Sequence, residues 1–187
     1  LATVWIGSAA ALTLSAQTDP EQTQLPTLQA QPEAAPKIKI EQLPNGDIRL
    51  GGITVHRHER VLSFPARMNM RRGILEVLVA TPEGRLHESL LSADVSPLHL
   101  QTLLYLLNLS NGPRVPDEQG RQGDLVDIDL EYRNADGETV REPVENWVLD
   151  TRIKQPMRRR GWVFVGSSVV DGVFQADAAG NLVTTYS

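Results

Sequence analysis

The sequence predicts an α+β domain that is mostly β, in which antiparallel hairpins form a sandwich or a curled sheet around one buried helix at about residues 97–109. Two observations support this fold class. Many short runs of apolar and β-branched residues are separated by Gly, Pro, Asn and Asp, as expected for strands and turns. A single leucine-rich stretch is long enough for an internal helix, and the sequence contains no repeat.

The composition fits one domain of ordinary size with a real hydrophobic core. The chain has 187 residues, 41% of them hydrophobic, and a formal net charge of −5. This mild charge does not indicate a nucleic-acid-binding protein. The absence of cysteine excludes disulfides, thiol catalysis and Cys-ligated metal clusters, and we expect no cofactor.

The first residues differ in composition from the rest of the chain. Residues 1–16 are apolar and small, which is typical of a truncated signal peptide, with a membrane anchor and a buried helix as the alternatives. Residues 17–36 are rich in Gln, Pro, Thr, Ala and Glu, which predicts a disordered linker. We therefore expect a single β-rich domain over residues 37–187, exported to the periplasm or secreted.

Short strands are expected at the start of this domain. Residues 37–41 alternate and suit an edge strand, and a Pro-Asn-Gly-Asp turn follows them. Further strand candidates, separated by turns, are residues 48–50, 53–57 and 60–64.

The longest apolar region, residues 73–91, is predicted to form a β-hairpin. Residues 74–81 are an apolar and β-branched run of strand length, and residues 86–91 run back after a turn at 82–85. Glu83-Gly84 would be its two-residue loop. Because both faces are mostly apolar, we expect the hairpin to be covered on both sides.

Strand alternation places Glu76, His87 and Ser89 on one face of this hairpin, whereas a register shifted by one residue would bring Glu88 beside Glu76. The four side chains are a candidate polar cluster or ligand site, since such groups can bind a metal or form a nucleophile–base set. A Ser–His pair on one strand has parallel side chains, and Leu91 replaces the second His of an H-E-x-x-H motif. A buried, hydrogen-bonded cluster that fixes the register is therefore the simplest interpretation, with a ligand site and catalysis as alternatives.

Ser96 and Pro97 predict the start of the internal helix, with Ser as N-cap and Pro at the first helical position. Leucines lie on nearly every side of residues 98–109, so we expect a helix that is buried all round and ends before residues 111–113.

Further strands are predicted in the C-terminal part of the chain. Residues 125–133 alternate cleanly and turn through Asn-Ala-Asp-Gly into residues 138–141, a second hairpin. A strand is expected at residues 161–167, and residues 173–176 are expected to pair with residues 182–186.

Two other polar patterns carry weaker indications. His56 and His58 share one face of a predicted strand, a spacing that a zinc site can use, but the charged residues around them favour an exposed face. An alternating acidic stripe predicts solvent-facing side chains rather than a calcium site, since a strand spreads such carboxylates about 7 Å apart. Its members are Asp127, Asp129 and Glu131, with Asp124 nearby.

Arg158, Arg159 and Arg160 form the one basic cluster of the sequence and are the candidate contact for a partner. An acidic protein or lipid head groups would suit it, while a solvated loop before the strand at Trp162 is the simpler interpretation.

Six segments, in this order and spacing, resemble the YdjY-like domain family of bacterial proteins, and the resemblance runs from about residue 38 to the C-terminus. They are Gly51-Gly52-Ile53, Phe64-Pro65-Ala66, Leu75-Glu76-Val77-Leu78-Val79, Gly84-Arg85-Leu86-His87-Glu88-Ser89-Leu90-Leu91, Gly161-Trp162-Val163-Phe164-Val165-Gly166-Ser167 and Phe174-Gln175-Ala176-Asp177. The resemblance implies no settled activity. The Cys-rich iron–sulfur segments of some relatives cannot be carried over to a chain without cysteine.

We therefore expect an exported bacterial domain that acts as a non-enzymatic binding or interaction module for a protein or a small ligand. The alternative is a hydrolase or metal-dependent enzyme that uses the Glu76, His87, Glu88 and Ser89 cluster. No metal or nucleic-acid partner is expected, and membrane contact is expected only if the N-terminal segment is uncleaved.

Overall fold

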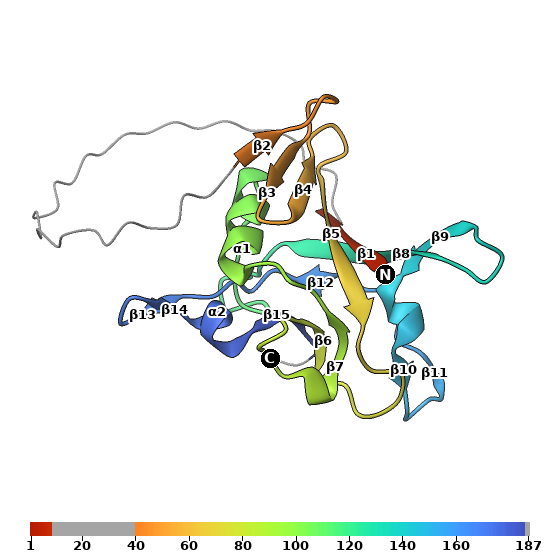
Figure 1. Ribbon diagram of the computed structural model, residues 1–187. Coiled ribbons are helices and arrows are strands. Elements are labelled where there is room, and N and C mark those ends of the chain that lie inside the picture. The colour runs from red at the N-terminus through yellow and green to blue at the C-terminus, as the bar shows by residue number, and fades with distance from the viewer. Residues whose placement is uncertain (9–39, 186–187) are drawn as a thin grey trace, which may run out of the picture.

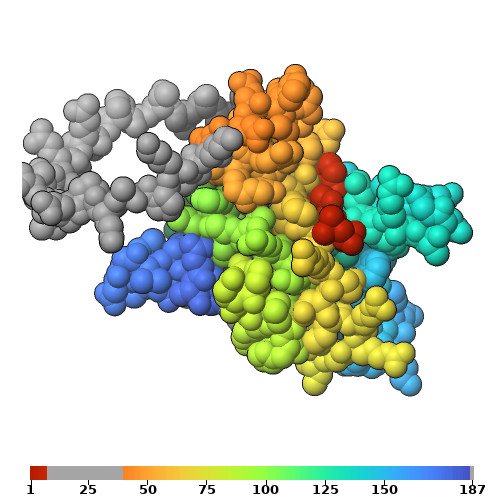
Figure 2. Space-filling view, in the orientation of Figure 1, coloured from red at the N-terminus to blue at the C-terminus, as the bar shows by residue number. Residues whose placement is uncertain are grey.

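The computed structural model describes residues 1–8 and 40–185, and it confirms the predicted fold class. The domain is mostly β, its sheets are largely antiparallel, and one principal helix lies beside them (Figure 1). The β8–β9 hairpin and the β13–β14 hairpin project from opposite sides of the molecule (Figure 2).

The main sheet has the strand order β12-β8-β1-β5-β4-β3-β2, with β9 added beside β8, and all of these pairs are antiparallel. Its strands are β1 (Ala2–Ser8), β2 (Ile40–Gln42), β3 (Ile48–Leu50), β4 (Ile53–His56), β5 (Val61–Met68), β8 (Leu125–Arg133), β9 (Thr139–Pro143) and β12 (Trp162–Val163).

The long strand β5 also belongs to a smaller group of strands. Its last residues pair with β7 (Ser89–Ser92), which pairs with β6 (Val77–Ala80), which in turn pairs with β15 (Asn181–Thr184). The sheets are therefore joined through one shared strand, which curls them around the core.

Helices and short strand pairs complete the described part of the chain. They are α1 (Pro97–Leu106), α2 (Gln175–Ala179), the 3₁₀ helices η1 (Leu86–Glu88) and η2 (Val144–Trp147), and the pairs β10 (Leu149–Asp150) with β11 (Gln155–Pro156) and β13 (Val169–Val170) with β14 (Val173–Phe174).

Strand alternation divides the main sheet into two faces. The inner face is apolar and packs with the buried side of α1 in one core cluster. The outer face carries the alternate residues, most of which are polar or charged on β4 and β8. The buried side of α1 consists of Pro97, Leu100, Leu103 and Leu104.

The predicted domain boundary at residue 37 is wrong, because β1 is an interior strand of the main sheet. It pairs with β5 on one side and with β8 on the other, and Val4 and Ile6 are buried. A signal peptide over residues 1–16 conflicts with this arrangement, since a cleaved segment cannot remain inside a sheet. The predicted linker at 17–36 lies outside the described residues.

The predicted hairpin over residues 73–91 is also wrong. Its two strands are β6 and β7, which pair in parallel, with Val77 opposite Ser89. The turn after β6 does not fold straight back, because Gly84 packs against the backbone of Gly180, where Thr81 N donates to Gly180 O at 2.8 Å. Runs that are apolar on both faces do not reveal strand direction, which is why the sequence could not decide this pairing.

Helix α1 begins where the sequence predicts. Ser96 Oγ accepts a hydrogen bond from His99 N at 3.3 Å, and Pro97 occupies the first turn. The helix ends at Leu106, and Asn108 follows with a φ of 61°, a left-handed conformation that breaks it. Leu106 is exposed, as is Leu98, so the helix is buried on one side and not all round.

The C-terminal pairing differs from the prediction as well. Residues 173–174 form β14 and pair with β13, residues 175–179 form α2, and β15 pairs with β6. The predicted strand at 161–167 shortens to β12. The hairpin of β8 and β9 is confirmed.

Candidate functional site

The sequence-predicted cluster does not form one site. The Ser89 side chain is fully buried and its hydroxyl donates to Leu91 O at 2.7 Å, whereas the His87 side chain is 78% exposed. Arg85 lies between the other two members, 3.5 Å from Glu76 and 2.7 Å from Glu88. The two glutamates are thus joined through Arg85, and His87 Nε2 lies 3.9 Å from Glu88 Oε1, whereas Ser89 faces the core.

A polar chain that the sequence analysis missed lies on the outer face of the sheet. His56 Nδ1 is 2.9 Å from Asp47 Oδ2, and His56 Nε2 is 2.8 Å from Ser63 Oγ. Asn45 Nδ2 also donates to Asp47 Oδ2 at 2.8 Å. The prediction that His56 is exposed and solvated is wrong, since its side chain is 20% exposed; His58 is exposed.

The electrostatics of this chain keep Asp47 ionised. Burial alone would raise the pKa of the Asp47 carboxyl, but hydrogen bonds from Asn45 and His56, together with the His56 charge, outweigh it and hold the pKa below its ordinary value of 3.8. Both ring nitrogens of His56 are satisfied, because Nδ1 shares a hydrogen bond with Asp47 Oδ2 and Nε2 shares one with Ser63 Oγ.

An Asp–His–Ser order is also that of serine hydrolases, but the surroundings of Ser63 do not support hydrolysis. Ser63 is 8% exposed and lies in the middle of β5, between β1 and β4. The backbone N–H groups around it are used in the two ladders, so none is free to stabilise an oxyanion. The geometry favours a structural role, in which the chain joins the β3–β4 region to β5.

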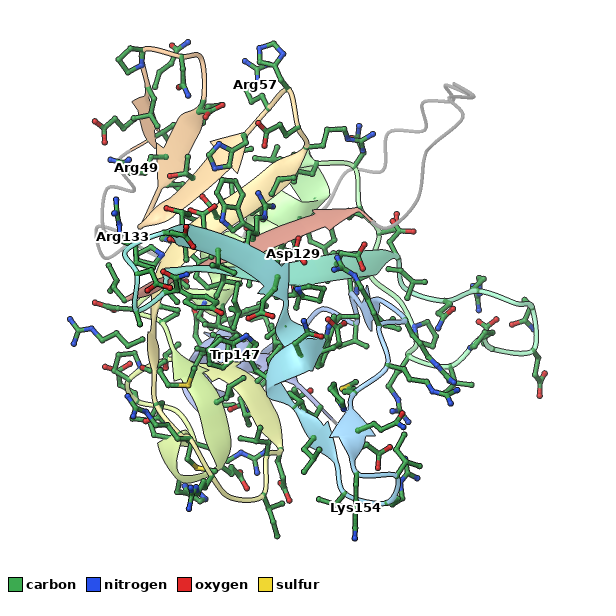
Figure 3. The ribbon with its side chains drawn as sticks, turned by 90° about the vertical axis from the view of Figure 1, so that its right-hand side faces the viewer. Arg49, Arg57, Asp129, Arg133, Trp147 and Lys154 are labelled. Carbon is green, nitrogen blue, oxygen red and sulfur yellow. The ribbon has the colours of Figure 1, made fainter. Side chains whose placement is uncertain are left out.

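Further polar contacts continue across the same face, which is turned toward the viewer in Figure 3, where Asp129 is labelled. The Trp5 ring stacks on His56 with centroids 4.6 Å apart, and the Arg141 guanidinium lies 4.1 Å from the Trp5 ring. Arg159 binds Asp127 at 3.2 Å and Asp129 at 2.9 Å, and Arg141 lies 3.6 Å from Asp129. We call Asp47, Trp5, His56, Ser63, Asp127, Asp129, Arg141 and Arg159 the outer network.

The predicted basic cluster is divided between two environments. Arg159 turns to the outer network, and its carboxylate partners raise its pKa although burial alone would lower it. Arg158 and Arg160 instead line a cavity, together with Arg114 from a distant loop. Successive side chains of an extended segment point in opposite directions, which explains the division. We call Arg114, Arg158 and Arg160 the arginine rim, because all three are exposed.

The cavity has a volume of about 560 Å³ and lies between the inner face of the sheet and the helices. The sheet contributes apolar residues, α1 contributes two leucines, and α2 and β15 close the remaining sides. Representative lining residues are Ile6, Leu100, Leu104, Val126, Trp162 and Phe174.

Several polar groups border the cavity. Gln101 exchanges two hydrogen bonds with the Ser167 backbone, at 3.1 and 2.6 Å. Trp162 Nε1 donates to Glu145 Oε1 at 2.9 Å, which leaves the indole edge fixed. Asn181 Oδ1 is buried without a hydrogen-bond partner in the described part of the chain. A buried acceptor of this kind normally meets a water or a ligand donor.

Alternation along the strands could have found part of this arrangement, since it puts His56 and Ser63 on one face. It could not place Asp47, which lies in the turn before β3, nor the cavity, which combines segments far apart in the sequence.

Residues 1–8 and 40–185 contain no group of three His, Asp or Glu side chains arranged to hold a metal ion. Within the same residues, no helix is long and apolar enough to cross a membrane.

Comparison of the chain with protein-family models, with curated proteins and with solved structures finds no match. The resemblance to the YdjY-like family therefore stays a prediction from the quoted segments.

Proposed function

We propose that this domain is a non-enzymatic binding module that holds a small apolar molecule in the cavity between the main sheet and its helices. The observation that carries the proposal is the cavity itself. It is partly open to solvent, and its volume of about 560 Å³ is within the range typical of small-molecule sites, about 300–1,000 Å³.

The lining of the cavity supports binding rather than chemistry. Its described residues are mostly apolar, and they include no Asp, Glu, Lys or His that could act as a general base. Burial of an apolar ligand would contribute roughly 25 cal/mol for each Å² removed from water. Asn181 Oδ1, which borders the cavity and has no partner among the described residues, is left for a water molecule.

The enzymatic alternative has less support. It requires Glu76, His87, Glu88 and Ser89 to act on one substrate, but Ser89 faces the core and His87 faces solvent. The outer network has a hydroxyl and an imidazole in contact, but the described strands on both sides of Ser63 use their backbone N–H groups in the β-ladders.

The proposal that the protein is exported to the periplasm or secreted has one support, the signal-like composition of residues 1–16. The place of β1 in the sheet is an argument for its retention. Mass measurement of the N-terminus of protein recovered from the producing cells separates a retained segment from a cleaved one.

The test of cavity binding uses N-phenyl-1-naphthylamine, a neutral dye that fluoresces in apolar surroundings. We expect saturable binding of one dye per chain, weakened by Val183→Phe, which fills the cavity from β15. Val140→Phe is the matched control, because Val140 is half-buried on β9, away from the cavity lining. Absence of saturable binding, or equal loss in both variants, would contradict the proposal.

A further inference from the structure

We infer that the ligand of this cavity is an amphipathic anion, a long-chain carboxylate whose tail lies among the apolar lining residues and whose head group binds the arginine rim. This inference rests on the proposed function and adds the chemical class of the ligand. Three observations on the charged residues that line the cavity support it: they are all positive, they are exposed, and their guanidinium groups have no partner among the described residues.

The charged side chains that line the cavity all have the same sign. Arg114, Arg158 and Arg160 are its charged residues in the described part of the chain, although the protein as a whole has a net charge of −5. Like charges that border one cavity repel one another, and a bound anion reduces that repulsion.

The position of these arginines separates the two parts of a ligand. All three are exposed and also line the cavity, so they lie at its opening, whereas residues such as Leu100 and Phe174 are buried. A ligand that fits both environments has a charged end that stays close to water and an apolar body that does not.

The guanidinium groups of the arginine rim are free for a ligand. Among the described residues, no hydrogen bond or ion pair engages them. The neighbouring Arg159 is the internal contrast, since it is held by both Asp127 and Asp129. A guanidinium presents a planar fork of donors that matches the two oxygens of a carboxylate, which is why arginine suits this head group.

Backbone geometry keeps the two rim arginines of the triplet in this position. Gly161 follows Arg160 with a φ of +76°, and a Cβ at this residue would lie 3.2 Å from Leu125 Cβ. The chain therefore makes a turn that favours glycine between the arginines and β12, whose Trp162 lines the cavity.

The experiment compares three probes with the same apolar tail: dodecanoate, dodecan-1-ol and dodecylammonium. Each probe is titrated into the complex of the full chain with N-phenyl-1-naphthylamine, at probe concentrations below those at which the probe forms micelles, and displacement of the dye is measured. We expect dodecanoate to bind about tenfold more tightly than dodecan-1-ol, because it makes charge-assisted hydrogen bonds, and dodecylammonium to bind most weakly.

The variant Arg158→Gln/Arg160→Gln should weaken dodecanoate binding about tenfold and change dodecan-1-ol binding less than about twofold. Arg159→Gln is the matched control from the same triplet and should leave both affinities unchanged. A salt titration of the unaltered protein gives a second measurement that needs no variant, since salt should weaken only dodecanoate binding.

The possible failures are distinguishable. If neither the neutral dye nor any of the three probes binds, the proposed function itself is wrong. If dodecan-1-ol binds as tightly as dodecanoate, or if Arg159→Gln has the same effect as the double variant, the cavity binds apolar molecules and only the assignment of an anion is overturned.

Discussion

The two faces of the main sheet differ in how their charged groups are satisfied. On the outer face, Asp47, His56 and Ser63 are joined in one chain, and Arg159 binds two aspartates. At the cavity on the inner face, the arginine rim has no partner among the described residues. The comparison teaches that polar groups in the order of a catalytic triad can join strands on one face of a sheet, while the charged groups without a partner on the other face border the proposed binding site.

Deletion of residues 1–8 should have the largest effect on stability, because it removes β1, which contributes side chains to both faces of the main sheet. Val4 and Ile6 leave the core, which costs about 1.5–3 kcal/mol for each, and Trp5 leaves the outer network. We expect loss of cooperative unfolding in circular dichroism. Deletion of Leu1 alone, which is 89% exposed, is the control. A truncated chain with an unchanged melting temperature would show that β1 is dispensable and would favour the signal-peptide prediction.

His56→Ala should have the second-largest effect on stability. It leaves Ser63 and Asp47 without their shared partner and removes the stack with Trp5, so we expect a loss of about 2–3 kcal/mol in the free energy of unfolding. Binding of N-phenyl-1-naphthylamine by the folded variant should not change. His58→Ala, at an exposed position, is the control for urea denaturation. A fall in dye affinity without a fall in stability would break the comparison between the faces.

The same chain should make stability depend on acid pH. Because the pKa of Asp47 is lower in the folded than in the unfolded protein, its contribution is present above the ordinary pKa of 3.8 and is lost as the pH falls through the folded value. Asp47→Asn should therefore reduce the steepness of this acid loss in a series of urea melts. The control is Asp136→Asn, in the exposed β8–β9 turn, and an acid limb that is equally steep in both variants would contradict the assignment.

Arg159→Gln should have a smaller effect. Its ion pairs with Asp127 and Asp129 are partly exposed and therefore screened by solvent, which limits the loss of stability to about 1 kcal/mol. Thermal melts at low and high salt give the measurement, and the difference between the variant and the parent should shrink as salt is added.

Arg158→Gln and Arg160→Gln should have the smallest effect on stability, within about 0.5 kcal/mol, because neither side chain has a partner to lose among the described residues. A loss as large as that of Arg159→Gln, measured in the same melts, would mean that the rim arginines support the fold and would remove the contrast between the two faces.

The sequence predicted correctly the elements that are marked by a helix cap or by a turn between neighbouring strands. Ser96 and Pro97 mark the start of α1, and the alternation before the Asn-Ala-Asp-Gly turn marks β8 and its hairpin with β9. The sequence could not predict the parallel pairing of β6 with β7, because both strands are buried and apolar on both faces.

The candidate site was predictable only in part. The arginine triplet was visible as a basic cluster, but its division between two faces depends on the extended path of the chain beside β8. The polar chain through His56 was missed because Asp47 lies in a turn and Ser63 in an apolar strand, where neither suggests a partner. The place of β1 was missed because a short apolar segment looks the same at the end of a signal peptide and inside a sheet.

The position of β1 has a consequence for the order in which the domain is completed during synthesis. One of its two neighbours, β8, is translated more than a hundred residues after β1. At about 5–20 residues per second, the nascent chain carries an apolar segment without its pairing partner for on the order of ten seconds. Chaperones that recognise exposed apolar segments would have that interval in which to act on this protein.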